Sequence, residues 1–212
     1  MRAGLVTCGT ACAVVGSVLG LAWGAQAAGL EKPTPGERVA ARSVAWLLRY
    51  RLVESALRVN GGRPVHGSCL QGWIGKRGHL RRGTVLALDN GLTLVHTQAS
   101  IRVLGATTRE PGTLPLVQLE LGGCSRVLAP RIGAALQSGR PLRLLNRRVD
   151  GRPALAFTVH EGRTRMTVFV QRRTYRPLAV EARSSRFHGH SRIRLTRLTP
   201  RKLRTILAGL PG

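Results

Sequence analysis

Two histidines in the C-terminal third have the spacing of a candidate metal pair. His188 and His190 flank Gly189, and side chains two residues apart in an extended chain lie on the same side. A protein zinc site needs further ligands at set spacings, and only 9 of the 212 residues are Asp or Glu. We therefore expect structural histidines in a turn, with no resident metal and no other cofactor.

Two cysteines, Cys69 and Cys124, follow the apolar N-terminal segment that contains Cys8 and Cys12. In an oxidising compartment such a pair is more often bonded than free. The bond would close a loop of about 55 residues, which the chain-entropy model values at roughly 4 kcal/mol. We predict a Cys69–Cys124 disulfide, and two separate buried thiols are the alternative.

Catalysis is a third use for Cys124. The segment Gly122-Gly123-Cys124-Ser125-Arg126 is similar to the nucleophile motif of the L,D-transpeptidases, secreted enzymes of wall cross-linking. Their chemistry needs a thiolate and an activating histidine. That family has a histidine directly before its Gly-Cys pair, where this chain has Gly122, and the nearest upstream histidine here is the distant His96. The disulfide is therefore favoured over a cysteine-dependent wall enzyme.

Other catalytic signatures are absent from the sequence. It contains no GxSxG, HExxH, P-loop or dinucleotide-binding motif. The nine acidic residues are scattered, and Asp89, Asp150 and Glu161 fall in expected turns. We therefore predict no catalytic residue and no enzymatic activity.

The charge balance is strongly basic. The chain has 34 Lys and Arg against 9 Asp and Glu, a formal net charge of +25, and only Lys32, Lys76 and Lys202 are lysine. Such an excess attracts anionic surfaces. Few aromatic residues accompany the arginine runs, so specific nucleic-acid binding is not expected.

The N-terminus predicts export. Arg2 precedes an apolar run, Leu5 to Trp23, which ends at Gly24-Ala25-Gln26-Ala27 with small residues where signal peptidase requires them. We assign residues 1–27 to a cleaved signal peptide, 28–35 to a linker and 36–212 to a single domain, secreted or periplasmic. An uncleaved anchor is the alternative, since the run is about long enough to span a bilayer.

The N-terminal half of the domain combines helices and strands. Thr34, Pro35 and Glu37 form the signature of a capping box, and three- and four-residue spacing of apolar residues predicts a helix over 35–59. Period-two alternation then predicts strands at 65–74, 80–88, 92–97, 99–104 and 115–121, a loop at 105–114, and a second helix at 124–138.

The C-terminal third predicts an antiparallel meander. Its strands are expected at 142–149, 153–160, 164–171, 177–184 and 190–198, followed by a short helix at 200–208. One face is apolar and the other basic. The apolar set comprises Leu155, Phe157, Val159, Met166, Val168, Val170, Leu178, Val180, Ile193 and Leu195, and the basic set comprises Arg165, Arg183, Arg192 and Arg194.

The meander resembles the LolA-like lipoprotein localisation factors and their relatives, including RseB-type sigma-factor regulators. The similarity lies in residues 166–180, which read MTVFVQRRTYRPLAV. The resemblance implies an α+β fold, in which a strongly curved antiparallel sheet, an incomplete β-barrel, wraps around two or three helices.

The family's use of this fold gives the leading functional hypothesis. It is a non-enzymatic extracytoplasmic carrier or sensor that binds a lipid or lipoprotein acyl chain against the apolar set and contacts an anionic membrane surface with the basic set. The alternative is a secreted basic domain that binds an anionic wall polymer or a membrane-protein partner.

Overall fold

The computed structural model describes residues 32–72, 83–97, 101–104, 114–161, 163–185 and 187–208. The chain divides into two units, residues 1–33 and Thr34–Gly212, and the second holds the helices and strands described below. The predicted signal peptide and residues 28–31 of the predicted linker lie outside the described residues.

The first helix, α2 (Pro35–Arg49), begins at the predicted capping box. Thr34 accepts a hydrogen bond from the Glu37 amide at 3.3 Å, and the Glu37 carboxylate accepts one from the Thr34 amide at 2.7 Å. The prediction that this helix continues to residue 59 is wrong. The backbone becomes extended at Tyr50, and Leu52–Val59 form strand β1. Val53 and Leu57 fit a helical spacing, but Val53, Ser55 and Leu57 also fit a strand, and only strand pairing separates the two.

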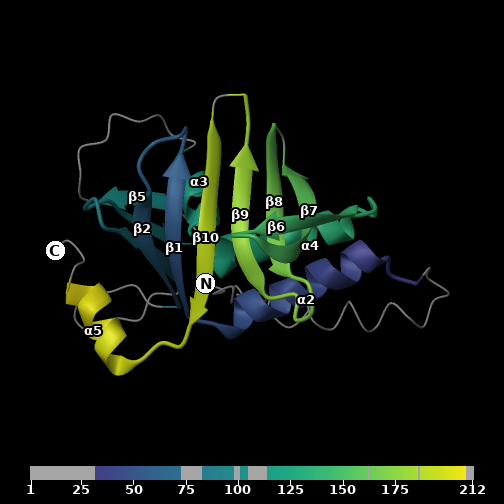
Figure 1. The fold of residues 1–212 in the computed structure, drawn as a ribbon. Coiled ribbons are helices and arrows are strands. Elements are labelled where there is room, and N and C mark those ends of the chain that lie inside the picture. Colours follow the sequence, from purple (N-terminus) through teal and green to yellow (C-terminus); the bar gives the residue numbers. More distant parts are fainter. Residues whose placement is uncertain are drawn as a thin grey trace, which may run out of the picture. The chain divides into compact units, whose positions relative to one another are not determined.

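One continuous antiparallel sheet contains ten strands in the order β5-β4-β3-β2-β1-β10-β9-β8-β7-β6 (Figure 1). The first strand pairs with the last, Val53 opposite Leu195, so β1 and β10 join the two halves of the sheet. The strands not yet bounded are β2 (Val65–Gln71), β3 (Gly83–Leu88), β4 (Thr93–Thr97), β5 (Ile101–Leu104), β6 (Leu144–Val149), β7 (Arg152–Glu161), β8 (Thr164–Gln171), β9 (Pro177–Arg183) and β10 (His188–Thr196).

The predicted strand at 115–121 is instead helix α3 (Leu114–Leu121). Its sequence LPLVQLEL is mainly apolar, and a short apolar run does not distinguish a buried strand from a buried helix. The second predicted helix is confirmed as α4 (Ser125–Gln137), and the last as α5 (Pro200–Ala208). The predicted loop at 105–114 lies outside the described residues except for Leu114.

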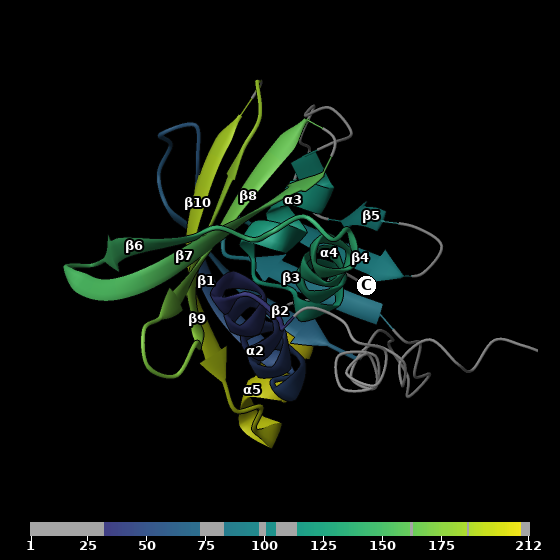
Figure 2. The same cartoon turned by 90° about the vertical axis from the view of Figure 1, so that its right-hand side faces the viewer.

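The sheet is curved and open, and α2, α3 and α4 cover its concave side (Figure 2). The predicted α+β fold class is therefore confirmed. Cross-strand partners Val53, Cys69, Leu86 and Leu94 share the covered face and are fully buried. Val44 and Leu47 of α2 and Leu128 and Ile132 of α4 complete the same core.

The predicted disulfide is confirmed. Cys69 of β2 is bonded to Cys124, which precedes the first residue of α4, with a Cα–Cα distance of 5.6 Å. Both cysteines are fully buried. The bond ties α4 to the centre of the sheet, and it occupies the sulfur that a cysteine-dependent enzyme would use as nucleophile.

Candidate functional site

The apolar set predicted to line a cavity lies on the helix-covered face. Seven of its members are fully or almost fully buried and pack in one cluster with α2 and α4, namely Phe157, Val159, Met166, Val168, Val170, Val180 and Leu195. Ile193 belongs to the same cluster, and Leu155 and Leu178 are half-buried. Nine of the ten residues therefore form the core or pack against it, whereas Leu178, at a register shift between β8 and β9, does not. The role of the set in binding an acyl chain remains a prediction.

The predicted basic set lies on the convex face, opposite the face that α2, α3 and α4 cover. Arg165 is directly opposite Arg183 in the β8–β9 register, and Arg192 and Arg194 lie two residues apart on β10. All four side chains are exposed. Like charges directly opposite one another in a sheet are unfavourable, so the Arg165–Arg183 pair favours an anion between or near the two guanidinium groups.

The β6–β7 hairpin makes the convex face uneven. It projects from the sheet on the side opposite α2 and α4 (Figure 2). Asp150 at its tip forms an ion pair with Arg192 of β10. Asp150 and Gly151 adopt left-handed φ values of 52° and 74°, which the tight turn requires. The ion pair joins the tip of the hairpin to β10 on the convex face.

A groove of about 190 Å³ lies on this face, lined by residues of β6, β8 and β9. Three of the lining residues are arginines, Arg147 from β6, Arg165 from β8 and Arg183 from β9. The remaining lining residues are Leu145, Thr167, Phe169 and Glu181. The groove is therefore amphipathic, with two apolar side chains beside a net positive charge.

Glu181 is the only carboxylate that lines the groove. Its Oε1 lies 3.6 Å from Arg183 Nη2 and 3.2 Å from His188 Nε2. Burial of the neighbouring His190 ring lowers the pKa of that histidine, and the negative charges of Glu181 and Asp150 oppose the effect. Since one carboxylate faces three arginines, the groove keeps positive charge for a ligand.

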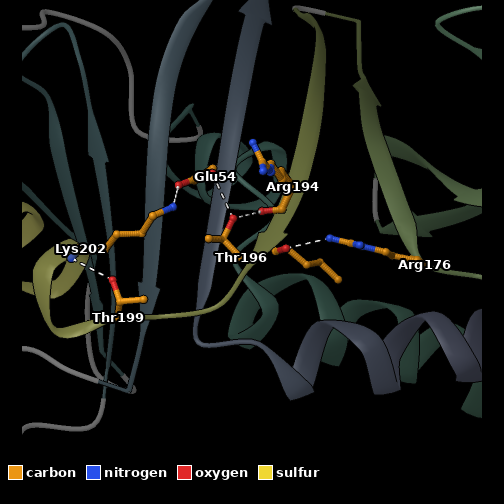
Figure 3. A network of polar contacts seen from close by, with 7 residues as sticks. Glu54, Arg176, Arg194, Thr196, Thr199 and Lys202 are labelled. Atoms are coloured by element: carbon orange, nitrogen blue, oxygen red, sulfur yellow. Dashed lines mark hydrogen bonds and ion pairs between the residues drawn. The ribbon is translucent and has the colours of Figure 1, made fainter.

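Arg194 belongs to a different polar network (Figure 3). Glu54 of β1 accepts hydrogen bonds from Thr196 Oγ1 at 3.0 Å and from Lys202 Nζ of α5. The main-chain oxygen of Arg194 accepts a bond from Thr196 Oγ1 at 3.3 Å. This network fastens α5 to β1 and β10. Arg194 is not among the residues that line the groove.

The sequence reasoning missed Arg147, Leu145 and Phe169 as groove residues. The run Arg147-Arg148 is visible in the sequence, but only the projection of the β6–β7 hairpin brings Arg147 close to Arg165 and Arg183. Phe169 alternates onto the convex face between Thr167 and Gln171, and that alternation is the signal that could have found it.

The chain matches known proteins only through solved structures with a similar course of the backbone. No protein-family model and no curated protein matches the chain. LprF from Mycobacterium bovis aligns with 80% of this chain and 97% of its own, with a TM-score of 0.42 and 10% identity. The Mycobacterium tuberculosis lipoprotein LppX aligns with 77% of this chain and 96% of its own, with a TM-score of 0.42 and 12% identity.

A structure of the Pseudomonas aeruginosa MucA/MucB complex also matches, over 80% of this chain, with a TM-score of 0.45 and 14% identity, and this chain spans 60% of the matched chain. A LolA superfamily protein from Nitrosomonas europaea aligns with a TM-score of 0.29 and 10% identity. All of these matches have TM-scores below 0.5 and identities of 14% or less, and we carry no residue role over from them.

The described residues include neither a metal-binding cluster nor a membrane-spanning helix. No group of three His, Cys, Asp or Glu side chains among them could hold a metal ion. His188 and His190 share one face of β10, as their spacing predicts, but the prediction that they lie in a turn is wrong because β10 begins at His188. No described helix is long and apolar enough to cross a bilayer.

Proposed function

We propose that the protein is a non-enzymatic, extracytoplasmic binding protein whose convex groove holds the anionic headgroup of a lipid at a membrane surface. The observation that carries the proposal is the convergence of Arg147, Arg165 and Arg183 on one groove that also contains Leu145 and Phe169. Guanidinium groups bind phosphate and carboxylate through paired, charge-assisted hydrogen bonds. The two apolar side chains suit the carbon atoms next to such a headgroup.

The size of the groove supports a headgroup rather than a whole lipid. Pockets that enclose a drug-sized ligand measure roughly 300–1,000 Å³, and this groove measures about 190 Å³. The Cys69–Cys124 disulfide supports an oxidising, extracytoplasmic location. The proposal requires no acyl chain in the core.

A soluble short-chain lipid tests the proposal. Dihexanoyl phosphatidylglycerol, kept below its micelle concentration, is titrated by calorimetry into the full chain and into Arg165→Gln/Arg183→Gln. Loss of two charge-assisted contacts predicts affinity weaker by about tenfold or more. The control Arg201→Gln/Arg204→Gln removes the same charge from exposed positions of α5 and should bind as the parent does.

Two results would reject the headgroup site. One is equal affinity for dihexanoyl phosphatidylcholine, whose headgroup carries no net charge. The other is equal loss in the groove variant and the α5 control. Tighter binding of inorganic polyphosphate than of the lipid would instead favour the anionic wall polymer as ligand.

The carrier hypothesis has a separate test. Native mass spectrometry of the protein purified from its host reports whether a lipid is retained. A retained diacyl lipid would show that the core opens, whereas a mass equal to the bare chain after incubation with membranes would reject acyl-chain carriage and leave the groove proposal standing.

A further inference from the structure

Aromatic and arginine side chains gather where the end of α2 meets the β8–β9 turn. We call this the aromatic–arginine patch, and it comprises Trp46, Tyr50, Tyr175, Arg42, Arg49 and Arg176. It shares no residue with the convex groove. The described part of the chain has six aromatic residues in total, so half of them lie in this patch.

The patch is held together by stacked rings and guanidinium groups. The Trp46 and Tyr50 rings stack with centroids 6.0 Å apart. Arg49 and Arg176 each place their guanidinium carbon 5.9 Å from the Trp46 ring centroid, and Arg42 lies 5.3 Å from that of Tyr175. Cations within about 6 Å of an aromatic face are attracted to it.

The β8–β9 turn is built to present these groups. Thr174 accepts a hydrogen bond from Trp46 Nε1 at 2.8 Å through its main-chain oxygen. Arg176 Nη2 donates to the Leu195 main-chain oxygen at 2.8 Å (Figure 3). Tyr175 adopts a left-handed φ of 58°, a conformation that costs free energy in a bulky residue and is retained where the surroundings require it.

Charge and exposure identify the partner. Arg172 and Arg173 extend the patch along the turn and are exposed, and within the described residues no carboxylate pairs with these two or with the three patch arginines. Leu48, on the outward side of α2, keeps 48% of its surface exposed. The three aromatic rings of the patch are half-buried against the core, so their outer parts and Leu48 are the apolar surface that a soluble polyanion would leave uncovered.

We propose that the aromatic–arginine patch is the surface that contacts the interface of an anionic phospholipid bilayer. Trp and Tyr rings suit the headgroup level because they combine an apolar body with a polar tip. Arginines near an anionic leaflet add attraction to lipid phosphates. The patch orients the protein on the bilayer, whether or not the convex groove binds a headgroup.

Vesicle partitioning tests this surface with the full chain. The quantity measured is the ratio of the partition coefficients for vesicles with 30 mol% phosphatidylglycerol and for pure phosphatidylcholine vesicles, because any affinity of the apolar N-terminal run is common to both. Arg172→Gln/Arg173→Gln should lower this ratio about tenfold or more. Arg201→Gln/Arg204→Gln removes equal charge from α5 and should lower it by less than about threefold.

Fluorescence gives a second readout, in a Trp23→Phe/Trp73→Phe background that leaves Trp46 as the only tryptophan. On anionic vesicles the Trp46 emission should shift to the blue and be quenched by brominated lipid. Unchanged emission, or equal losses in the two double variants, would overturn the proposal. Arg165→Gln/Arg183→Gln, which tests the groove, should leave Trp46 quenching intact, so failure of one site does not imply failure of the other.

Discussion

Glu54 is the residue at which three elements meet, because its carboxylate joins β1 to β10 through Thr196 and to α5 through Lys202 (Figure 3). The hydrogen bond from Lys202 is the main cause that lowers the pKa of Glu54 below its ordinary 4.5, and partial burial opposes it. The folded state therefore favours the ionised carboxylate, and α5 is attached through a charged contact.

Replacement of Glu54 gives a pH-dependent prediction. Because the pKa of Glu54 is lower in the folded than in the unfolded state, its ionised carboxylate stabilises the fold at pH values above the unfolded-state pKa. This stabilisation is lost as the pH falls through the folded-state pKa. Glu54→Gln should cost about 0.5 kcal/mol at pH 7, a value kept small by solvent screening, and less at pH 3. Urea unfolding at both pH values measures it, with the exposed Asp89→Asn as control. An equal cost at both pH values would contradict the ionic explanation.

At the scale of the element, α2 is positioned by a glycine. A Cβ on Gly36, in the first turn of α2, would overlap the main-chain oxygen of Leu142, the residue that leads from α4 towards β6. Gly133 in α4 has no heavy atom within 4 Å of its would-be Cβ. Substitution of Gly36 therefore reports on close packing, whereas substitution of Gly133 reports on helix propensity alone.

Alanine at these two positions should change stability in opposite directions. Gly36→Ala should destabilise the fold by about 3 kcal/mol, because the backbone near Leu142 must move. Gly133→Ala should stabilise it by roughly 0.5–1 kcal/mol, since Ala is the better helix former. Denaturant unfolding of both variants measures the difference. A stabilising Gly36→Ala would show that α2 and the 140–143 segment are not in close contact.

At the scale of the whole molecule, the disulfide joins parts of the chain 55 residues apart. Cys69 lies in the sheet and Cys124 at the start of α4, so the bond fixes the helix layer to the strand layer. Cys69→Ala/Cys124→Ala should lower the free energy of unfolding by about 4 kcal/mol. Guanidinium unfolding with and without reductant measures it, and the reductant should destabilise the parent but not the double variant. Equal parent stability in both conditions would contradict a structural bond.

The sequence alone determined the strand–turn alternation of the C-terminal meander, the start of α2 and its capping box, and the separation of apolar from basic faces. These features are local, because period-two alternation and capping involve residues within a few positions of one another. Where a segment fitted a helix and a strand equally well, tertiary contacts decided between the two. Leu52–Val59 became β1 because β2 and β10 lie on either side to accept its hydrogen bonds, and the apolar run Leu114–Leu121 became a helix.

The groove depended on tertiary structure most of all. Arg147, Arg165 and Arg183 belong to three strands. Sequence alternation does not show that residues of three strands line one groove. The groove depends on the curvature of the sheet and on the position of the β6–β7 hairpin, whose tip residue Asp150 forms an ion pair with Arg192 of β10. Sheet curvature is a sum of twist over many strand pairs, so no short segment of the sequence encodes it.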